Sequence, residues 1–390
     1  MTPAARVQTS IELLDAVIAA ARDKGAPADR ILAEWFRSNR FAGSKDRRAI
    51  RELVYAAIRA CGPVPRSGRA AMLRLAENDE TLAPLFDGSN YGPAPIQPGE
   101  AAAHGGAAPD WLVARLAASD IAGDEAQGLL DRAPLDLRVN TLKAERATLD
   151  LPVDAEPTAT PHGLRLPAGT HVEQWPEWRE GKIEVQDTGS QAVCLAAVAR
   201  PGEVVVDLCA GGGGKTLALA ADMQLQGRLI ACDTDRGRLS RLQPRAERAG
   251  AEGIETRLLN PGQEAAALAD LTGTADLVLV DAPCSGTGTW RRNPEARWRL
   301  DEDELARLVS LQAHILDLAV PLLGKGGRLV YVTCSLLDEE GAGQFAALLA
   351  RHPQLSAQPL ALPLGRERGE GMRLTPFHDG TDGFFIACAA

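Results

Sequence analysis

The sequence predicts an α/β protein built around an open, largely parallel β-sheet. Val204–Asp207 is a β-branched run without a polar break, which is typical of a strand buried on both faces of such a sheet. Four consecutive glycines, Gly211–Gly214, and the helical pattern Thr216–Asp222 follow this strand. From there to the C-terminus, apolar strand-like runs alternate with helix-like runs, as in βαβ units. A small α+β module and an N-terminal helical domain are expected to precede this part of the chain.

Length and composition are those of an ordinary water-soluble protein. The 390 residues suggest two or three domains, each large enough for its own core. No apolar run reaches the length of a membrane span, and the N-terminus lacks the short apolar core of a signal peptide. We therefore expect no membrane partner.

The distribution of the cysteines bears on the cellular location of the protein and on metal binding. All seven are scattered, form no C-x-x-C pair and lie mostly in apolar runs. This distribution argues against a disulfide framework or a zinc site, so no metal is expected. It favours a reduced, cytoplasmic location.

The first domain, residues 1–108, is expected to be helical and to end in a loose connection. Ile11, Leu14 and Val17 keep a helical period, and similar periods continue to about residue 60. A short helix is expected at 68–76, within a stretch after residue 60 that is rich in Gly, Pro and Ala.

A basic segment in this domain, Arg37–Arg51, is the first candidate for RNA contact. The net charge of −10 argues weakly against nucleic acid, because non-specific binding depends on cations. This segment is denser in cations than any other part of the chain, and a local patch overrides a net value. The alternative interpretation is a solvated face without a partner.

Residues 109–185 are expected to form a small α+β module. Two helical patterns precede an alternating strand, and two shorter strand-like pieces follow it. These elements are expected at Trp111–Ala118, Asp124–Asp131, Leu135–Leu142, Leu164–Leu166 and Lys182–Val185.

Residues 186–390 are expected to form the α/β domain. A helix from Gln186 to Ala199, with Ser190 as a plausible cap, leads into the first strand. The later elements are expected, in order, as strand Arg228–Asp233, helix Leu239–Ala249, strand Thr256–Leu259, strand Ala275–Val280, helix Glu302–Leu323, strand Gly326–Ser335, helix Asp338–Ala350 and an antiparallel strand within Gly383–Cys388. Polar residues and cysteines recur where these strands end, which is where open α/β sheets bind ligands.

The glycine loop favours an adenosyl ligand over a phosphate ligand. Glycines let the backbone approach a ligand, and the helix that follows offers unpaired N–H groups. A Walker A loop needs a glycine at the position of Cys209, and the dinucleotide fingerprint needs one at Thr216. S-adenosylmethionine is therefore the leading candidate, and a glycine-rich turn without a ligand is the alternative. Asp233, at the end of the next strand, suits a ribose diol, with Asp235 as its competitor.

Cys284 and Cys334 each follow a buried strand directly and are each followed by serine. If these strands neighbour the first one, both thiols face the same crevice as the glycine loop. A cysteine in an apolar run is most often inert core. These two are instead expected at turns beside helix starts, which lower a thiol pKa.

Three motifs together resemble one family. Asp207–Thr216, Asp281-Ala-Pro-Cys-Ser and Thr333-Cys-Ser are similar to the motifs of the RsmB/Sun (Fmu) and Nop family of RNA cytosine-5 methyltransferases. Leu137-Arg-Val-Asn, Val185-Gln-Asp and Asp382-Gly-Phe-Phe support the resemblance, which covers residues 109–390. It implies a Rossmann-like, S-adenosylmethionine-dependent methyltransferase domain. Residues 1–108 resemble, more loosely, the NusB-like domain of the bacterial rRNA enzymes.

The resemblance implies a role for each motif residue. Cys334 would be the nucleophile, Cys284 would help to release the product, and Asp281 would hold the edge of a flipped cytosine. The residues that would bind S-adenosylmethionine are Cys209, Ala210, Gly211, Gly212, Gly213, Gly214, Lys215, Asp233 and Asp281.

The chemistry explains why two thiols and an acid are needed. Cytosine C5 is a poor nucleophile, but thiolate addition at C6 turns it into an enamine carbon that can attack a sulfonium methyl group. A partly buried, proton-bearing Asp281 near N3 would stabilise the developing negative charge. The base must also be out of any stack, so unpaired or flipped RNA is required.

Two positions depart from the family pattern. The family usually has Ala-Pro where this loop has Gly211-Gly212, a change that keeps the tight turn but loosens it. The family also tends to have an acid after the third strand, where this chain has Asn260.

Four functions fit the sequence, and the first is preferred. It is 5-cytosine methylation of 16S rRNA by a protein that is expected to be monomeric. The second is the same chemistry on tRNA or another RNA. The third is a non-catalytic RNA-binding or ribosome-assembly factor, against which Cys284, Cys334, Asp281 and Lys215 argue. The fourth is a small-molecule methyltransferase, which the paired cysteines and the N-terminal modules disfavour.

Overall fold

The structure, a computed structural model, describes residues 1–390 and divides them into two compact units. The first contains Met1–Asp131 and Thr289–Asp301, and the second contains Arg132–Gly288 and Glu302–Ala390. These units differ from the three predicted domains, because the helices expected in the middle module belong to the first unit. Thr289–Asp301 also joins that unit, although it lies far along the chain.

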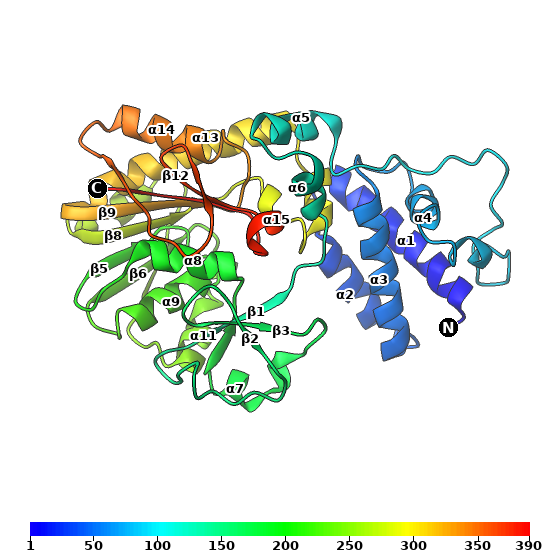
Figure 1. Cartoon of the computed structure of the whole chain (residues 1–390), viewed down its shortest axis with the longest axis horizontal. Helices are drawn as coiled ribbons and strands as arrows, with labels where there is room; N and C mark the ends of the chain where they lie inside the picture. The colour runs from blue at the N-terminus through cyan, green and yellow to red at the C-terminus, as the bar shows by residue number, and fades with distance from the viewer. The chain divides into compact units, whose positions relative to one another are not determined.

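The first unit is helical (Figure 1). Its helices are α1 (Pro3–Arg22), α2 (Ala28–Ser38), α3 (Ser44–Ala60), α4 (Gly68–Ala76), α5 (Asp110–Ala118) and α6 (Gly123–Gly128). The predicted helices of the first 76 residues are therefore confirmed. The apolar faces of α1, α3 and α4 form its core, where Leu14, Ile50 and Met72 are fully buried.

The segment Thr289–Asp301 completes this helical core, and no sequence pattern predicted that. Arg297 is fully buried and donates from Nη2 to the carbonyl oxygens of Ile58 (2.7 Å) and Cys61 (2.6 Å). The last carbonyls of a helix have no intrahelical partner, so Arg297 satisfies the end of α3. Trp298 donates from Nε1 to the Gly62 oxygen at 3.1 Å and packs in the same core.

The second unit contains a small antiparallel sheet in the order β2-β3-β1-β4. Its strands are β1 (Leu135–Val139), β2 (Glu156–Pro157), β3 (Gly163–Leu166) and β4 (Ile183–Val185), with α7 at Pro176–Arg179. The three strands expected from the sequence are thus present. Asn140 connects this sheet to the main domain, because its Nδ2 donates to the oxygens of Gly181 and Ala249, each at 2.8 Å.

The main sheet of the second unit has the order β11-β12-β13-β9-β8-β5-β6-β7. Strands β5 to β9 are parallel neighbours, and β13 pairs antiparallel with β9, as the sequence predicted. The strands are β5 (Val204–Asp207), β6 (Arg228–Asp233), β7 (Glu255–Leu258), β8 (Ala275–Asp281), β9 (Leu323–Thr333), β10 (Ala357–Gln358), β11 (Arg366–Arg368), β12 (Gly371–Leu374) and β13 (Phe384–Ala389).

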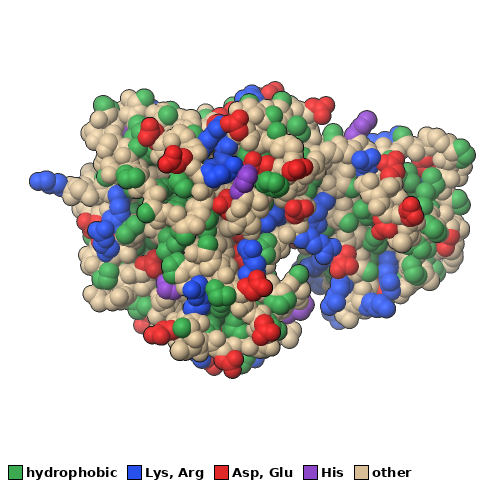
Figure 2. All heavy atoms as spheres, in the orientation of Figure 1, with side chains coloured by type: hydrophobic (Ala, Val, Ile, Leu, Met, Phe, Trp, Pro, Cys, Tyr) green, Lys and Arg blue, Asp and Glu red, His purple; other side chains and the backbone are tan.

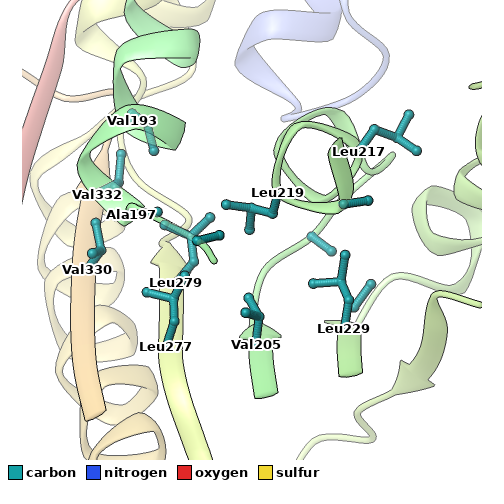
Figure 3. Packing of buried hydrophobic residues seen from close by; sticks show 14 of the residues in the cluster. Val193, Ala197, Val205, Leu217, Leu219, Leu229, Leu277, Leu279, Val330 and Val332 are labelled. Atoms are coloured by element: carbon teal, nitrogen blue, oxygen red, sulfur yellow. The ribbon is translucent and has the colours of Figure 1, made fainter. Parts of the chain in front are cut away.

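Helices cover both faces of this sheet (Figure 1), which explains why its strands are apolar throughout. They are α8 (Thr188–Ala197), α9 (Gly214–Asp222), α10 (Arg236–Leu239), α11 (Leu242–Ala249), α12 (Glu264–Ala267), α13 (Glu302–Ala319), α14 (Ala342–Arg351) and α15 (Pro376–Asp379). On one face, α8 and α9 pack against strand residues such as Val205 and Leu279 (Figure 3). On the other face, Leu316 of α13 and Phe345 of α14 pack against Tyr331. The predicted α/β, Rossmann-like fold is confirmed.

Two helix starts differ from the prediction. The cap of α8 is Asp187 rather than Ser190, because the Asp187 side chain accepts a hydrogen bond from Gly189 N at 2.7 Å. Helix α14 begins at Ala342 rather than at Asp338, because a turn precedes it in which Gly341 N donates to the Leu337 oxygen at 3.0 Å.

The absence of any membrane-length apolar run, expected from the sequence, needs a correction. The stretch Glu302–Leu322 is long and apolar enough to cross a membrane, by length and composition only. One such helix is a weak indication, since the core helix of a soluble protein meets the same criterion. The apolar side of α13 packs against the main sheet.

Candidate active site

A cavity of about 730 Å³ lies within the second unit, where β5, β6, β8 and β9 end. Its volume falls in the range of small-molecule sites. Ten of the residues that the sequence singled out line it: Cys209, Ala210, Gly211, Gly212, Gly214, Lys215, Asp233, Asp281, Cys284 and Cys334. The expectation that the two cysteines share a crevice with the glycine loop therefore holds in this structure.

The glycine loop needs its glycines for conformation and for close packing. Gly211 (φ 56°) and Gly213 (φ 82°) lie in the left-handed region that favours glycine. Gly213 does not line the cavity but precedes α9, and a Cβ there would come within 2.0 Å of the Leu242 side chain. The loop therefore turns sharply and directs the start of α9 at the cavity.

Two side chains hold the glycine loop through hydrogen bonds. Asp233 accepts a hydrogen bond from Gly211 N at 2.8 Å through Oδ2. Arg245 of α11 donates from Nη1 to the Gly212 oxygen at 2.6 Å. The same guanidinium contacts the buried Glu184 of β4 through Nη2 at 3.0 Å. These contacts fix the two glycines whose substitution for Ala-Pro was expected to loosen the turn.

Asp233 and Asp235, the two candidates for a ribose partner, have different positions. Asp233 lines the cavity, and its Oδ1 accepts from Asp235 N at 2.7 Å. Asp235 instead caps α10, where its side chain accepts from Arg238 N at 3.0 Å. The structure thus brings only Asp233 to the cavity.

Asp207 is a buried acid at the floor of the cavity. One carboxylate oxygen accepts from Thr216 Oγ1 at 2.7 Å, whereas Oδ1 is buried without a hydrogen-bond partner. The pKa of Asp207 is raised to about 7, because burial and the charge of Asp281 together outweigh the lowering effect of the Thr216 hydrogen bond. An unpartnered carboxylate oxygen in a cavity suits a cationic ligand, which fits the sulfonium and ammonium groups of S-adenosylmethionine.

Lys215 and Asp281 form an ion pair inside the cavity, with Nζ and Oδ2 2.6 Å apart. Burial alone would lower the pKa of Lys215, but the charge and hydrogen bond of Asp281 raise it above its usual value. The ammonium also lies 5.7 Å from the ring centroid of Phe384. Asp281 was expected to carry a proton, and the structure instead pairs it with a cation.

The two cysteine sulfurs lie 3.3 Å apart, as close as a hydrogen bond between thiols allows. The hydrogen bond to Cys334, burial and the charges of Cys334 and Glu340 together raise the pKa of Cys284 well above its usual value. The expectation that a helix start lowers the pKa of Cys284 is therefore wrong. A short 3₁₀ helix begins at Thr287, soon after Cys284, but it does not offset these effects.

Several cavity residues escaped the sequence analysis. Four residues of α13 line the cavity and recur at helical spacing: Leu311, His314, Ile315 and Leu318. The sequence predicted this helix but assigned these residues no role in a site. Glu264 lines it too, while Asn260, where the family tends to have an acid, does not. The only sequence signal for the four α13 residues was the amphipathic pattern of the helix.

The basic segment Arg37–Arg51 belongs to the helical unit and spans the end of α2 and the start of α3. Figure 2 shows Lys and Arg side chains over these two helices on the face in view. Lys45 and Arg48 are exposed. Arg47 is half-buried, donates from Nε to the Ala42 oxygen at 2.7 Å and lies over the ring of Phe36.

Comparisons with known proteins agree with this fold. The family model described as 16S rRNA methyltransferase RsmB/F matches residues 194–389. The probable ribosomal RNA small subunit methyltransferase B of Synechocystis is 36% identical over 72% of this chain and 66% of its own length. The ribosomal RNA small subunit methyltransferase B of Citrobacter koseri is 35% identical over 72% of this chain and 65% of its own length.

Among solved structures, the crystal structure of PH0851 has a TM-score of 0.77 at 25% identity, covering 100% of this chain and 99% of that one. The chain spans about 65% of the length of the curated relatives that it matches.

Proposed function

The chain belongs to the RsmB/F family of 16S rRNA methyltransferases, and from that premise we propose that it methylates cytosine C5 in RNA with S-adenosylmethionine. The observation that carries this proposal is the pair of cysteine sulfurs 3.3 Å apart in the cavity that the glycine loop lines. A methyltransferase that needs no covalent step has no use for two adjacent thiols at the ends of neighbouring strands.

The residues present suit the cofactor. S-adenosylmethionine, when bound, would supply a methyl group on a sulfonium centre. The glycine loop and the N–H groups at the start of α9 would receive its polar end, and Asp233 its ribose. The acids Asp207 and Asp281 would stabilise positive charge in a partly buried site.

Cys334 and Cys284 would share the covalent work. The Cys334 thiolate adds to C6 of the cytosine, forming the S–C6 bond and turning C5 into the carbon that accepts the methyl group. Negative charge that develops on the base would be stabilised by the Lys215–Asp281 pair. Cys284, once it has released its own proton to water, takes the C5 proton as a thiolate, the C5–C6 double bond re-forms, and the S–C6 bond breaks to restore the Cys334 thiolate.

We infer ribosomal RNA as the substrate class from the names of the relatives, and tRNA or another RNA remains the alternative. The base must leave its stack to reach a cavity of this kind, so an unpaired or flipped cytosine is expected. We also propose that the protein acts in the cytoplasm and as a monomer.

Bisulfite sequencing of total RNA tests the proposal directly. Cells that lack the gene should lose one or more 5-methylcytosines in 16S rRNA, and wild-type protein but not Cys334→Ala should restore them. Loss of a site in tRNA instead would change the substrate but keep the chemistry. Identical methylation maps with and without the gene would refute the enzyme assignment and favour a non-catalytic RNA-binding factor.

A further inference from the structure

The loops that carry the two cysteines are connected through the serines that follow them. Ser285 Oγ and Ser335 Oγ lie 3.1 Å apart, and Thr287 Oγ1 lies 3.2 Å from Ser335 Oγ. Thr287 also accepts from Leu336 N at 2.8 Å. The recurrence of serine after each cysteine thus has a structural reason: the hydroxyl groups hold one loop against the other.

Glu340, just before α14, is fully buried beneath this connection. Its Oε1 accepts from Ser285 N at 2.8 Å and from Gln312 Nε2 at 2.9 Å. Its Oε2 accepts from the hydroxyl of Ser285. Burying a carboxylate is unfavourable unless it is hydrogen-bonded, and three donors meet this one. Two of them belong to the residue next to Cys284.

The charged groups around the thiol pair are distributed unequally. Cys284 interacts with Tyr331 of β9 and with Cys334, which follows that strand. The effects of Cys334 and of burial on the pKa of Cys284 are the largest, and the negative charge of Glu340 raises this pKa further. The ammonium of Lys215 is the nearby cation, and the charge of Cys334 is among the causes that raise its pKa. Negative charge is thus disfavoured at Cys284, whereas the cation Lys215 interacts with Cys334.

We propose, on the basis of the proposed function, that Glu340 is a positioning residue that keeps Cys284 in its thiol form and so directs the thiolate of the pair to Cys334. Glu340 does so through two features: its hydrogen bonds hold the Cys284 loop, and its charge opposes a second negative charge on that loop. The resemblance gave the two cysteines different roles without a physical reason, and Glu340 supplies one.

The placement of the thiolate at Cys334 and of the thiol at Cys284 also sets the order of the reaction steps. When Cys334 bonds to C6 it loses its negative charge, and the largest cause of the raised pKa of Cys284, the hydrogen bond to Cys334, disappears together with the effect of that charge, while burial remains. Cys284 can then release its proton to water and accept the C5 proton as a thiolate. The departing Cys334 thiolate restores the starting state, so one cycle releases one net proton, as methylation by a sulfonium requires.

Alkylation of the full-length protein by iodoacetamide tests this proposal, because only thiolates react rapidly. Peptide mass spectrometry follows the reaction rate of each cysteine over a pH range that extends above the usual pKa of a thiol. In the wild type, Cys334 should react at lower pH than Cys284. Glu340→Gln, which keeps an acceptor oxygen for Ser285 but removes the charge, should lower the midpoint for Cys284 by about one pH unit, a tenfold faster reaction below the midpoint. Glu339→Gln is the matched control and should leave that midpoint in place.

Equal midpoints for Cys284 in wild type and Glu340→Gln, or an equal change in Glu339→Gln, would overturn the proposal. If Glu340→Gln does not fold, single-thiol variants decide: Cys284 in Cys334→Ser should titrate above Cys334 in Cys284→Ser, and the reverse order overturns the proposal. The assay needs no RNA. If the two midpoints differ as expected but the protein methylates no RNA, only the proposed function is refuted. If the protein methylates RNA but the midpoints do not differ in this way, only the role of Glu340 is refuted.

Discussion

Asp207 shows how one buried acid at the cavity floor makes stability depend on pH. Its pKa of about 7 in the folded protein lies well above the usual value of 3.8, because burial disfavours the charge. The folded state therefore binds more protons than the unfolded state between these two values, and the wild type loses stability as pH rises from about 4 to 7. Above pH 7 the loss is complete.

We expect Asp207→Asn to be more stable than the wild type at pH 8, and the difference to be larger there than at pH 5. The amide keeps an acceptor for Thr216 but carries no charge. Between pH 5 and pH 8, the difference in free energy of unfolding between the variant and the wild type should grow by about 2 to 3 kcal/mol, since one pKa unit corresponds to about 1.4 kcal/mol. Urea denaturation of both proteins at the two pH values measures it. The same difference at pH 5 and pH 8 would show that Asp207 does not titrate in this range.

Sequence reasoning found the residues that lie together along the chain and missed those brought together by folding. Cys209–Lys215 and the cysteine motifs were visible because each is a short run at the end of an apolar strand. Arg245 and Glu340 were not, because their contacts to Gly212 and Ser285 span 33 and 55 residues. Neither belongs to a motif that the analysis recognised.

At the scale of elements, α11 and β4 stabilise the glycine loop through Arg245. We expect Arg245→Met to weaken binding of S-adenosylmethionine about tenfold, because a charge-assisted hydrogen bond contributes roughly 1.5 to 3 kcal/mol. Calorimetric titration of the purified protein with S-adenosylmethionine measures this. The free energy of unfolding should fall as well, since Arg245 also pairs with Glu184.

Arg248→Met is the matched control for this prediction. Arg248 contacts the same carboxylate, Glu184, and stacks on Trp178 at 3.8 Å, but it has no bond to the loop. It should therefore lower stability without changing cofactor affinity. Equal affinities for the two variants would mean that the loop does not depend on Arg245.

The basic segment Arg37–Arg51 carries the other prediction at this scale, that the exposed cations at the start of α3 contact RNA phosphates. The double variant Lys45→Gln/Arg48→Gln should bind rRNA more weakly, and the slope of log affinity against log salt should fall by about 0.7 to 0.9 per lost contact. Arg47 is excluded from the variant because its bond to Ala42 and its contact with Phe36 are structural.

The control for the basic segment is the double variant Arg200→Gln/Lys325→Gln, which removes two exposed cations from the second unit. Filter binding at several salt concentrations compares the two double variants. If the salt slope changes equally in both double variants, or in neither of them, the basic segment is a solvated face without an RNA contact.

At the scale of the whole molecule, the fold class and the central strands could be predicted, but their assembly could not. Buried parallel strands have a distinctive apolar pattern, so β5, β6, β8 and β9 were recognised from it. The placement of Thr289–Asp301 in the helical unit depends on Arg297 reaching carbonyls more than 200 residues away in sequence. A local pattern carries no information on such a contact.

The central claim is that two thiols in one cavity divide a covalent reaction, with attack by Cys334 and release by Cys284. Trapping on a denaturing gel tests it most directly, with wild type, Cys284→Ala and Cys334→Ala each incubated with 16S rRNA and S-adenosylmethionine. The account predicts a covalent protein–RNA complex that accumulates with Cys284→Ala, because its S–C6 bond forms but breaks slowly. Cys334→Ala should be inactive and form no such complex. A complex that forms with Cys334→Ala instead, or two variants that stay active without trapping RNA, would contradict the account.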